Sequence, residues 1–494
     1  MNVFGDSWFV MLGYLFLIKP GVISGIPTLA IIDTAFDVCR IALIALTVLD
    51  LLVVPIDKHD SKLTVILLIF AAEAWKILST MIAGHGYSDW GAIMNTVGIV
   101  LFTYSCLRAD QSNFLAGASK VLGFYVLLNT ATVLFFPNGL YATTQYTQNY
   151  FLSYRTAWFP IYLLAAVLVM LNAEVNPSQI ARTWRNVIIA AIFLSLCAVW
   201  TATGIFCFSI AAIMFFVCWK YRDGKAVNGR WILLAEGIIF LLMVVLRLQE
   251  KFAFILVGIL KKDITMTARL RIWDNAIKSI SSHLLTGIGN LGNTEMKSIL
   301  GFGATHAHNY FLNTALCYGI IGVVLSLTPI CYTMSRKYKN ALIALISSCA
   351  CLALLTAYQV ECYMTIGYYL LPIYLPIEQQ VRQHGFPPDK RGHLQIRLVM
   401  EQAVQRMFDG LPAAFIRGFI HMEGQAGDGF GDHAHAGING RNLNGRAGAD
   451  RLAGTAHTEV KAGRGGYGVL GLVPRAEEAG ERIFHKHSPV SKLK

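Results

Sequence analysis

Hydrophobic and polar residues along this chain are sorted into long apolar runs separated by short polar loops. A membrane-spanning helix needs about 20 mostly apolar residues. Windows of that length find twelve candidate helices before residue 380. They cover residues 8–30, 34–54, 63–82, 91–107, 118–135, 157–174, 186–200, 203–219, 231–248, 309–331, 340–357 and 363–377. The pattern therefore predicts an all-α polytopic membrane protein with about 12 transmembrane helices.

Two of these runs leave their boundaries open. The first contains Lys19-Pro20-Gly21, where the proline can end a helix because its ring clashes with the preceding turn. Residues 186–219 fit either two short helices that turn near Thr201-Ala202-Thr203-Gly204 or one helix too long for a bilayer. The pattern thus allows ten to twelve helices, and the alternation of charge among the loops favours twelve.

Composition agrees with a membrane protein. The 494 residues are 55% hydrophobic and only 14% charged, against a usual charged share of about 25%. A net charge of +12 would indicate a nucleic-acid partner in a soluble protein, but here the basic residues lie in short clusters between apolar runs. We therefore interpret them as topology signals and expect the chain to contact the lipid bilayer and no nucleic acid.

The loops also predict the orientation, because Lys and Arg accumulate in short cytoplasmic loops. Every second loop is basic, through Lys58, Lys62, Arg108, Lys120, Arg182, Arg185, Lys220, Arg222, Lys225, Arg230, Arg336, Lys337 and Lys339. The loops between them, at 83–90 and 136–156, hold almost no basic residues except Arg155. With twelve helices both termini are cytoplasmic, and one long loop at 249–308 faces the outside.

The chain changes character after residue 380. Roughly one residue in four between 424 and 480 is glycine, and apolar periodicity disappears. We expect residues 1–380 to form the transmembrane core and residues 381–494 to form a Gly-rich, disordered cytoplasmic tail. The ten cysteines lie in or beside apolar runs without metal-binding spacing, so we interpret them as reduced and structural.

The long outside loop holds the candidate chemistry. It contains Arg269 and Arg271, five glycines within 287–303, and His306 and His308. Guanidinium groups match phosphate oxygens through forked N–H donors, and glycines let the backbone approach a ligand closely. The loop therefore suits anion binding, although on spacing alone the two arginines could equally be juxtamembrane anchors.

His308 and Asn309 stand where the chain enters the tenth apolar run. An imidazole at that boundary loses part of its hydration, which favours the neutral form that a general base needs. From position alone, a histidine that only caps the start of a helix is the more common case.

Four short motifs follow one another around this loop. They are Arg269-x-x-x-Trp273-x-x-Ala276, Gly287-Ile-Gly289-Asn-Leu-Gly292, His308-Asn309-x-Phe-Leu312 and Gly319-Ile-Ile-Gly322. In this order they resemble the signature of bacterial O-antigen ligases and polymerases, and span number and orientation extend the resemblance over residues 1–380.

The resemblance implies a glycosyltransferase of the bacterial inner membrane. Because diphosphate is a good leaving group that arginines can hold, and no Asp-x-Asp pair stands in the outside loops, we expect it to need no metal and no cofactor. Its donor would be a glycan on undecaprenyl diphosphate, its acceptor a glycan or the lipid A core, and a chain-length regulator and a flippase would be further partners. The residues that the resemblance implies are His308 as catalytic base, Arg269, Arg155 and Arg271 as diphosphate-binding groups, and Gly287, Gly289 and Asn309 for loop geometry.

The sequence departs from the family pattern in three places. Leu284 replaces a usual proline, Ile161 rather than asparagine follows Pro160 near Arg155, and a Ser-Arg pair is missing from the turn at 200–204. The last departure concerns one of the family's phosphate contacts.

Three functions compete on the sequence alone. We favour a polymerase that joins repeat units of O-antigen, capsule or exopolysaccharide, because the outside loops other than 249–308 are short. A ligase that transfers finished chains to the lipid A core uses the same donor. A flippase or transporter would need mid-membrane charges, for which Asp33, Asp37, Arg40 and Glu73 are candidates, but no internal repeat accompanies them.

Overall fold

A computed structural model describes residues 3–54, 60–143, 146–222, 224–247, 269–336, 338 and 340–361 of the chain. The helix predicted at 363–377 and the tail predicted at 381–494 lie outside these residues. Across the described part the chain forms helices, and its only β-type contacts are isolated bridges within residues 141–154. The prediction of an all-α protein is confirmed for this part.

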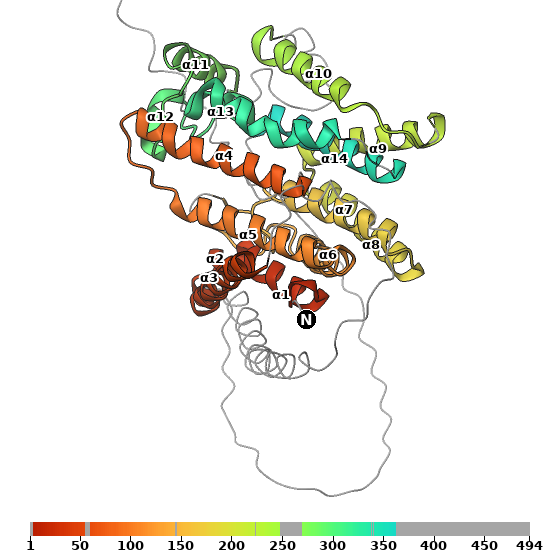
Figure 1. Ribbon diagram of the computed structural model, residues 1–494. Coiled ribbons are helices and arrows are strands. Elements are labelled where there is room, and N and C mark those ends of the chain that lie inside the picture. The colour runs from red at the N-terminus through yellow and green to blue at the C-terminus, as the bar shows by residue number, and fades with distance from the viewer. Residues whose placement is uncertain are drawn as a thin grey trace, which may run out of the picture. The chain divides into compact units, whose positions relative to one another are not determined.

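The helices follow one another along the chain as shown in Figure 1. They are α1 (Ser7–Leu17), α2 (Gly21–Gly25), α3 (Ala30–Val53), α4 (Ser61–Ile82), α5 (Trp90–Ala109), α6 (Gln111–Phe135), α7 (Phe159–Val175), α8 (Gln179–Ala198), α9 (Ala202–Tyr221), α10 (Gly229–Phe240), α11 (Arg269–Ser282), α12 (Asn293–Leu300), α13 (Tyr310–Ser335) and α14 (Ala341–Val360).

Eight helical segments of the described part are long and apolar enough to cross a membrane. They are α1 with α2, α4, α5, α6, α8, α9, α13 and α14. Many apolar side chains on the helices are exposed, among them Ile31, Leu52, Val53 and Ile180, each at least 77% exposed. Such surfaces suit contact with lipid, so the described helices are those of a multi-pass membrane protein.

Three further predicted runs are helical but fail that test of length and composition. The helix α3 carries Asp33, Asp37, Arg40 and Asp50 along its apolar run. The helix α7 has only 17 residues. The helix α10 ends at Phe240 and passes into one π-helical turn at Leu241–Val245. The total of twelve and the outside position of the long loop therefore stay predictions.

Helix boundaries follow from local chemistry. The first run breaks after Leu17, and Pro20 stands immediately before α2. The stretch 186–219 is two helices, separated by a turn in which Trp200 has a φ of 50°. The prediction that α6 starts at residue 118 is wrong, because Asp110 accepts a hydrogen bond from the Asn113 amide and starts the helix at Gln111.

Several charges in or beside the helices are paired with one another. Lys19 contacts Asp33 at 2.7 Å and Asp37 at 3.0 Å. On α4, Lys76 contacts Glu73 at 2.5 Å, and both side chains are buried. Pairing of this kind offsets part of the cost of removing charges from water, so these residues have a structural explanation.

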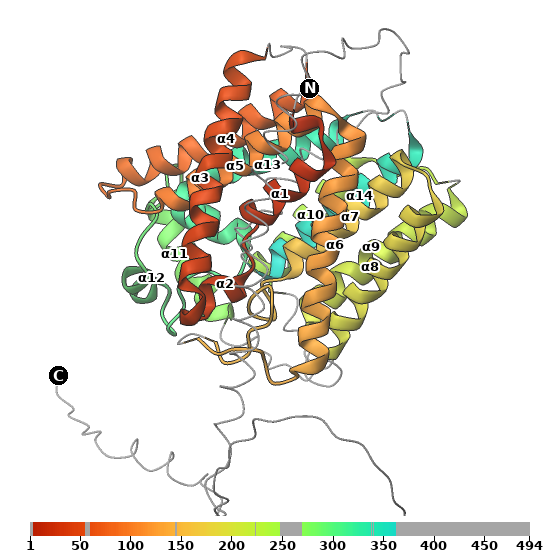
Figure 2. The same ribbon diagram turned by 90° about the horizontal axis from the view of Figure 1, so that it is seen from below.

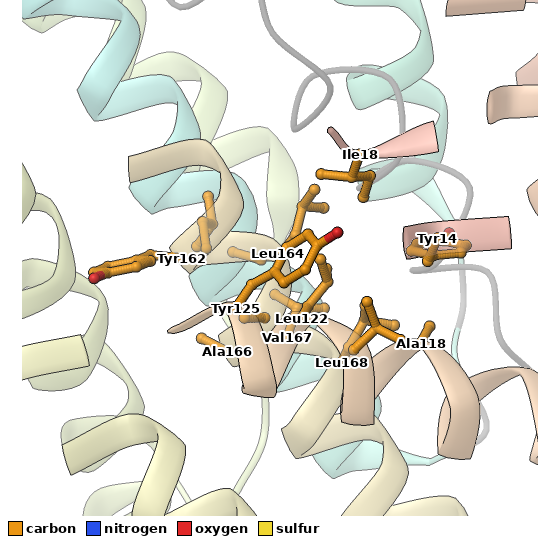
Figure 3. Packing of buried hydrophobic residues seen from close by; sticks show 14 of the residues in the cluster. Tyr14, Ile18, Ala118, Leu122, Tyr125, Tyr162, Leu164, Ala166, Val167 and Leu168 are labelled. Carbon is orange, nitrogen blue, oxygen red and sulfur yellow. The ribbon is translucent and has the colours of Figure 1, made fainter. Parts of the chain in front are cut away.

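The main core lies between α6 and the helices α1, α7 and α8, which all contact it. Figure 3 shows Tyr14, Tyr125 and Tyr162 packed among aliphatic side chains there. Each hydroxyl has a partner, since Tyr14 contacts Thr103 at 2.8 Å, Tyr125 donates to a backbone carbonyl, and Tyr162 accepts from an asparagine. These buried tyrosines fix the helix positions without leaving a polar group unpaired.

A second, smaller core supports the polar loop. The helix α13 packs along α4 and against α11, and α11 also contacts α12. Figures 1 and 2 both show α11 and α12 on the same side of the bundle, away from α8 and α9. Trp273, Ala276, Leu300 and Leu316 are buried in this core. The part of the long loop that the structure describes is therefore folded onto the start of α13.

Candidate functional site

A kink in α13 receives the glycine-rich segment of the loop. Gly319 lies inside α13 with a φ of 67°, a left-handed value that breaks the helical hydrogen bonding and frees nearby carbonyls. The amide of Ile288 donates to the Leu316 carbonyl at 2.9 Å, and the amide of Gly289 donates to the Cys317 carbonyl at 2.8 Å. The loop is thereby joined to α13 by backbone hydrogen bonds.

Gly287 and Gly289 are required by this close approach. Both have positive φ, at 71° and 82°. A Cβ on Gly287 would collide with the backbone of Cys317 and Tyr318. A Cβ on Gly289 would meet Thr80 and Ala83 at the end of α4. Their role in loop geometry stays a prediction, but Gly287 approaches α13 and Gly289 approaches α4, and the amides of both donate to protein carbonyls.

The helix α11 presents the first arginine of the loop and a tryptophan on one face. Arg269, Trp273 and Ala276 are spaced three or four residues apart, so they follow one another on successive turns. Trp273 is buried, and its indole N–H donates to the carbonyl of Ala307 at 2.8 Å. The motif spacing therefore aligns Arg269 with the segment that carries His308.

Hydrogen bonds on both sides hold that segment. Asn313 accepts from the Ala307 amide at 3.0 Å. Asn309 caps α13 by accepting from the Leu312 amide at 2.9 Å, and its side-chain amide donates to the Gln359 carbonyl, also at 2.9 Å. Asn309 is thus a capping residue that also ties the start of α13 to the end of α14.

His308 has an unusual backbone between these anchors. Its φ is 51°, in the left-handed region that few residues other than glycine adopt. Such conformations cost roughly 1–3 kcal/mol and persist only where the surroundings enforce them, most often at functional sites. The hydrogen bonds of Ala307 and Asn309 supply that constraint, so the orientation of His308 is imposed by its neighbours.

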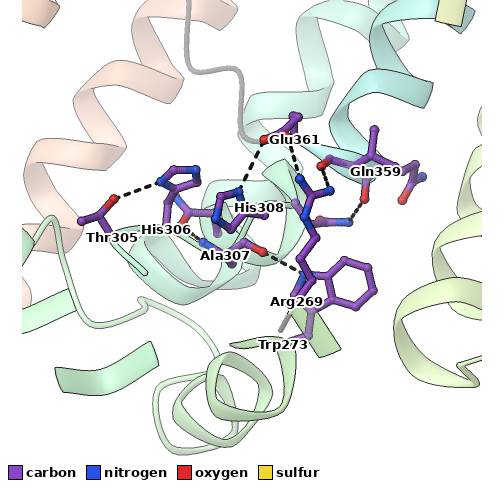
Figure 4. Close-up of polar contacts among 11 residues, drawn as sticks. Arg269, Trp273, Thr305, His306, Ala307, His308, Gln359 and Glu361 are labelled. Carbon is purple, nitrogen blue, oxygen red and sulfur yellow. Dashed lines mark hydrogen bonds and ion pairs between the residues drawn. The ribbon is translucent and has the colours of Figure 1, made fainter. Parts of the chain in front are cut away.

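Arg269 and His308 meet at a carboxylate, as Figure 4 shows. Arg269 Nη2 lies 2.6 Å from Glu361 Oε1, and Nη1 donates to the Val360 carbonyl at 2.6 Å. His308 Nδ1 lies 3.5 Å from the other oxygen, Glu361 Oε2. Two residues that the sequence assigned to one site are therefore brought together through a third.

Glu361 is the residue that the sequence reasoning missed. It directly follows α14, so it stands in the short polar gap between the runs predicted at 340–357 and 363–377. It is the only charged residue in that gap, and this is the signal that could have drawn attention to it.

Ionisation at the site follows from burial and these contacts. Burial is the largest of the effects that together lower the pKa of His306 to about 4; the charges of His308 and Arg269 act in the same direction and that of Glu361 opposes them. Burial alone would raise the pKa of Glu361, but the contacts with His308 and Arg269 outweigh it and leave that pKa below its usual value. At neutral pH the site therefore holds a carboxylate, a guanidinium and a neutral His306.

The same side chains could also hold a metal ion. Ligand atoms of His306, His308 and Glu361 all lie within 4.8 Å of one another. Arg269 already contacts one carboxylate oxygen, and its positive charge would oppose a cation there. The prediction that no metal takes part is untested.

Arg271 and Arg155 are placed differently from Arg269. Arg271 is exposed and lies over the ring of Phe302, 5.6 Å from the ring centre to the guanidinium carbon. Residues two apart on a helix point in different directions, so Arg271 lies on a different face of α11 from Arg269. Arg271 therefore binds the diphosphate only if the lipid-linked glycan extends over that face of α11.

Arg155 lies on the loop before α7, beside Tyr154. Tyr154 stacks on Tyr146 with ring centres 4.0 Å apart. Burial, then Tyr154, then the charge of Glu361 raise the pKa of Tyr146. Arg155 is therefore linked through Tyr154 to Tyr146, the side chain on which the charge of Glu361 acts.

Comparison with protein families gives a match in the second half of the bundle. The model of the O-antigen ligase family matches residues 188–327. That range runs from α8 into α13 and includes Arg269 and His308, whereas Arg155 and Glu361 lie outside it. No curated protein matches the chain. The family match supports membership of the superfamily to which the four motifs point.

Proposed function

We propose that this member of the O-antigen ligase and polymerase superfamily joins glycan repeat units carried on undecaprenyl diphosphate at the outer face of the inner membrane. The observation that carries the proposal is the meeting of Arg269 and His308 at Glu361. An arginine and a histidine held together at the end of a membrane helix fit transfer from a lipid diphosphate, because one can bind the leaving group and the other can activate the acceptor.

His308 acts as the general base. The acceptor hydroxyl gives its proton to the imidazole while its oxygen forms the new bond to the anomeric carbon of the donor glycan. The bond from that carbon to the diphosphate oxygen breaks, and its electron pair leaves with undecaprenyl diphosphate. A positioned base of this kind contributes about 10²–10⁴-fold.

Arg269 stabilises the diphosphate as charge builds on it. Its guanidinium has five N–H donors, of which two make the contacts with Val360 and Glu361. Arg155 adds a second cation from the loop before α7, and Arg271 is a reserve on the next face of α11. Loss of one electrostatic donor costs about 10²–10³-fold in comparable sites.

Polymerisation is the favoured form of this transfer. The described loops outside 249–308 are short, the longest connecting α6 to α7, and they offer no broad basic platform for a lipid A core. The second candidate, ligation to the lipid A core, is favoured by the description of the matching family. Both use the same donor and the same two residues.

Surface polysaccharide from a strain that lacks the gene, complemented with wild type or His308→Ala, separates these functions. Single-repeat glycan on the acceptor in the mutant indicates a polymerase, whereas a bare acceptor with long carrier-linked chains indicates a ligase. Normal ladders from a stably inserted His308→Ala protein would refute a catalytic role and leave transport to be tested.

A further inference from the structure

The carboxylate of Glu361 is shared between the two residues that the proposed function depends on. One oxygen lies 2.6 Å from Arg269 and the other lies 3.5 Å from His308. Glu361 is only 17% exposed, so solvent screens these contacts weakly. It comes from the end of α14, outside the range that matches the family model.

We propose that Glu361 is a positioning residue, which sets the tautomer of His308 and holds Arg269 in place; this inference rests on the proposed function. A neutral His308 whose Nδ1–H points to the carboxylate presents an unprotonated Nε2 to the acceptor hydroxyl. The 3.5 Å separation is long for a hydrogen bond, and catalytic contacts of this kind commonly shorten once substrate is bound.

The last residues of α14 are themselves firmly held. Gln359 donates from Nε2 to the Glu236 carboxylate at 3.2 Å and to the Glu236 carbonyl at 3.0 Å. Thr356 donates to the other Glu236 oxygen at 2.6 Å. Each of these residues contacts the site: Gln359 contacts Asn309, Val360 contacts Arg269, and Glu361 contacts His308. The anchoring of this segment on α10 therefore fixes the site.

Four described elements bring titratable groups to His308 or Glu361. The loop before α13 contributes His306, whose ring centre is 4.3 Å from that of His308. The helix α11 contributes Arg269, the end of α14 contributes Glu361, and the loop before α7 contributes Tyr146. Of these groups, the Glu361 carboxylate carries the one full negative charge. Its removal should therefore change the pH dependence of transfer.

The test compares Glu361→Gln with Glu361→Ala in purified protein, using a defined glycan on undecaprenyl diphosphate and a glycan acceptor. Glu361→Gln should lower kcat by about 10- to 100-fold, by analogy with the loss of activity when a metal-binding histidine loses its outer-shell carboxylate partner. The acidic limb of the pH–rate profile of Glu361→Gln should also move to lower pH. Glu361→Ala should additionally raise KM for the donor, since Arg269 then loses its carboxylate partner and keeps the contact with the Val360 carbonyl.

Glu295→Gln is the matched control. Glu295 is an exposed carboxylate of the same outside loop that accepts from the Gly292 amide at 3.0 Å, and glutamine can keep that bond. It should leave kcat and the pH profile unchanged.

His308→Ala and Arg269→Ala in the same assay distinguish a failure of the positioning role of Glu361 from a failure of the proposed function. If both are inactive while Glu361→Gln keeps wild-type kcat and pH profile, the positioning role is overturned and the proposed function stands. If Glu361→Gln loses activity but its pH profile is unshifted, its role is structural and the inference is likewise overturned. Activity in His308→Ala would remove the proposed function itself.

Discussion

Trp273→Phe tests how the site is built, because it removes one hydrogen bond and keeps most of the packing. The indole N–H of Trp273 donates to the Ala307 carbonyl at 2.8 Å, and both residues are almost fully buried. Phenylalanine fills much of the same space but cannot donate. The carbonyl next to His308 would then be buried without this partner.

The expected loss of activity follows from that carbonyl, because burying it without a hydrogen-bond partner costs about 1–3 kcal/mol. If the cost is relieved by movement of the 304–308 segment, the orientation of His308 is lost. The transition state would then be destabilised by a similar amount, which corresponds to roughly a 5- to 150-fold decrease in kcat. Arg269 does not depend on this bond, so KM for the donor should change little.

The assay is steady-state transfer by purified protein in lipid, together with hydrogen exchange of the segment that contains Ala307 and His308. Faster exchange there should accompany the lower kcat. Trp90→Phe is the control, since Trp90 is 54% exposed and lies at the start of α5. Wild-type kcat in Trp273→Phe, with unchanged exchange, would show that this bond does not position His308.

Three other predictions follow from the described residues. Gly319→Ala should lower the yield of folded protein, because a Cβ there collides with the Leu285 carbonyl at a positive φ, whereas Gly237→Ala has open space and should fold normally; thermal unfolding of both variants in detergent decides this. The free energy of unfolding should decrease as pH falls from about 6.5 towards 4, because the pKa of His306 is about 4 in the folded protein against an ordinary 6.5. An unchanged pH dependence of unfolding in His306→Asn would contradict this. Chelators should leave transfer by the purified protein unaffected, and activity that is lost with a chelator and restored by a divalent cation would show instead that His306, His308 and Glu361 hold a metal.

Much of the fold can be predicted from the apolar runs, and the exceptions have local causes. The helix predicted at 63–82 is observed at Ser61–Ile82, because clear polar loops flank it. The start of α6 was misplaced because Gln111, Ser112 and Asn113 interrupt the apolar run although Asp110 caps the helix there. Hydropathy detects burial in lipid, and a polar first turn with a good cap does not register in it.

The helices α11 and α12 show a second limit of the apolar pattern. They are short and amphipathic, so a window of membrane length averages them into a polar loop. Leu270, Trp273 and Ala276 nevertheless recur at helical spacing and pack on α13. That periodicity was available in the sequence and predicts one buried face.

The site divides in the same way between local and long-range information. Arg269 and His308 could be nominated because each belongs to a recognisable short motif. Glu361 is marked in the sequence only as the charged residue of a short polar gap, and its partners are not, because they depend on how α14 packs beside the start of α13, a contact between segments far apart in sequence. Arg271 follows Arg269 by two residues, and on a helix that spacing places it on another face, where it lies over Phe302.

The most direct test of the account is a double-mutant cycle with His308→Ala, Arg269→Ala and the combined variant, measured as transfer by purified protein with insertion and folding verified. Each single change should reduce transfer by at least about 10²-fold. Because both residues serve one transition state, the double variant should be much less impaired than the product of the single effects predicts. Near-wild-type transfer by either single variant would contradict the account, and fully multiplicative losses would show that the two residues do not act together.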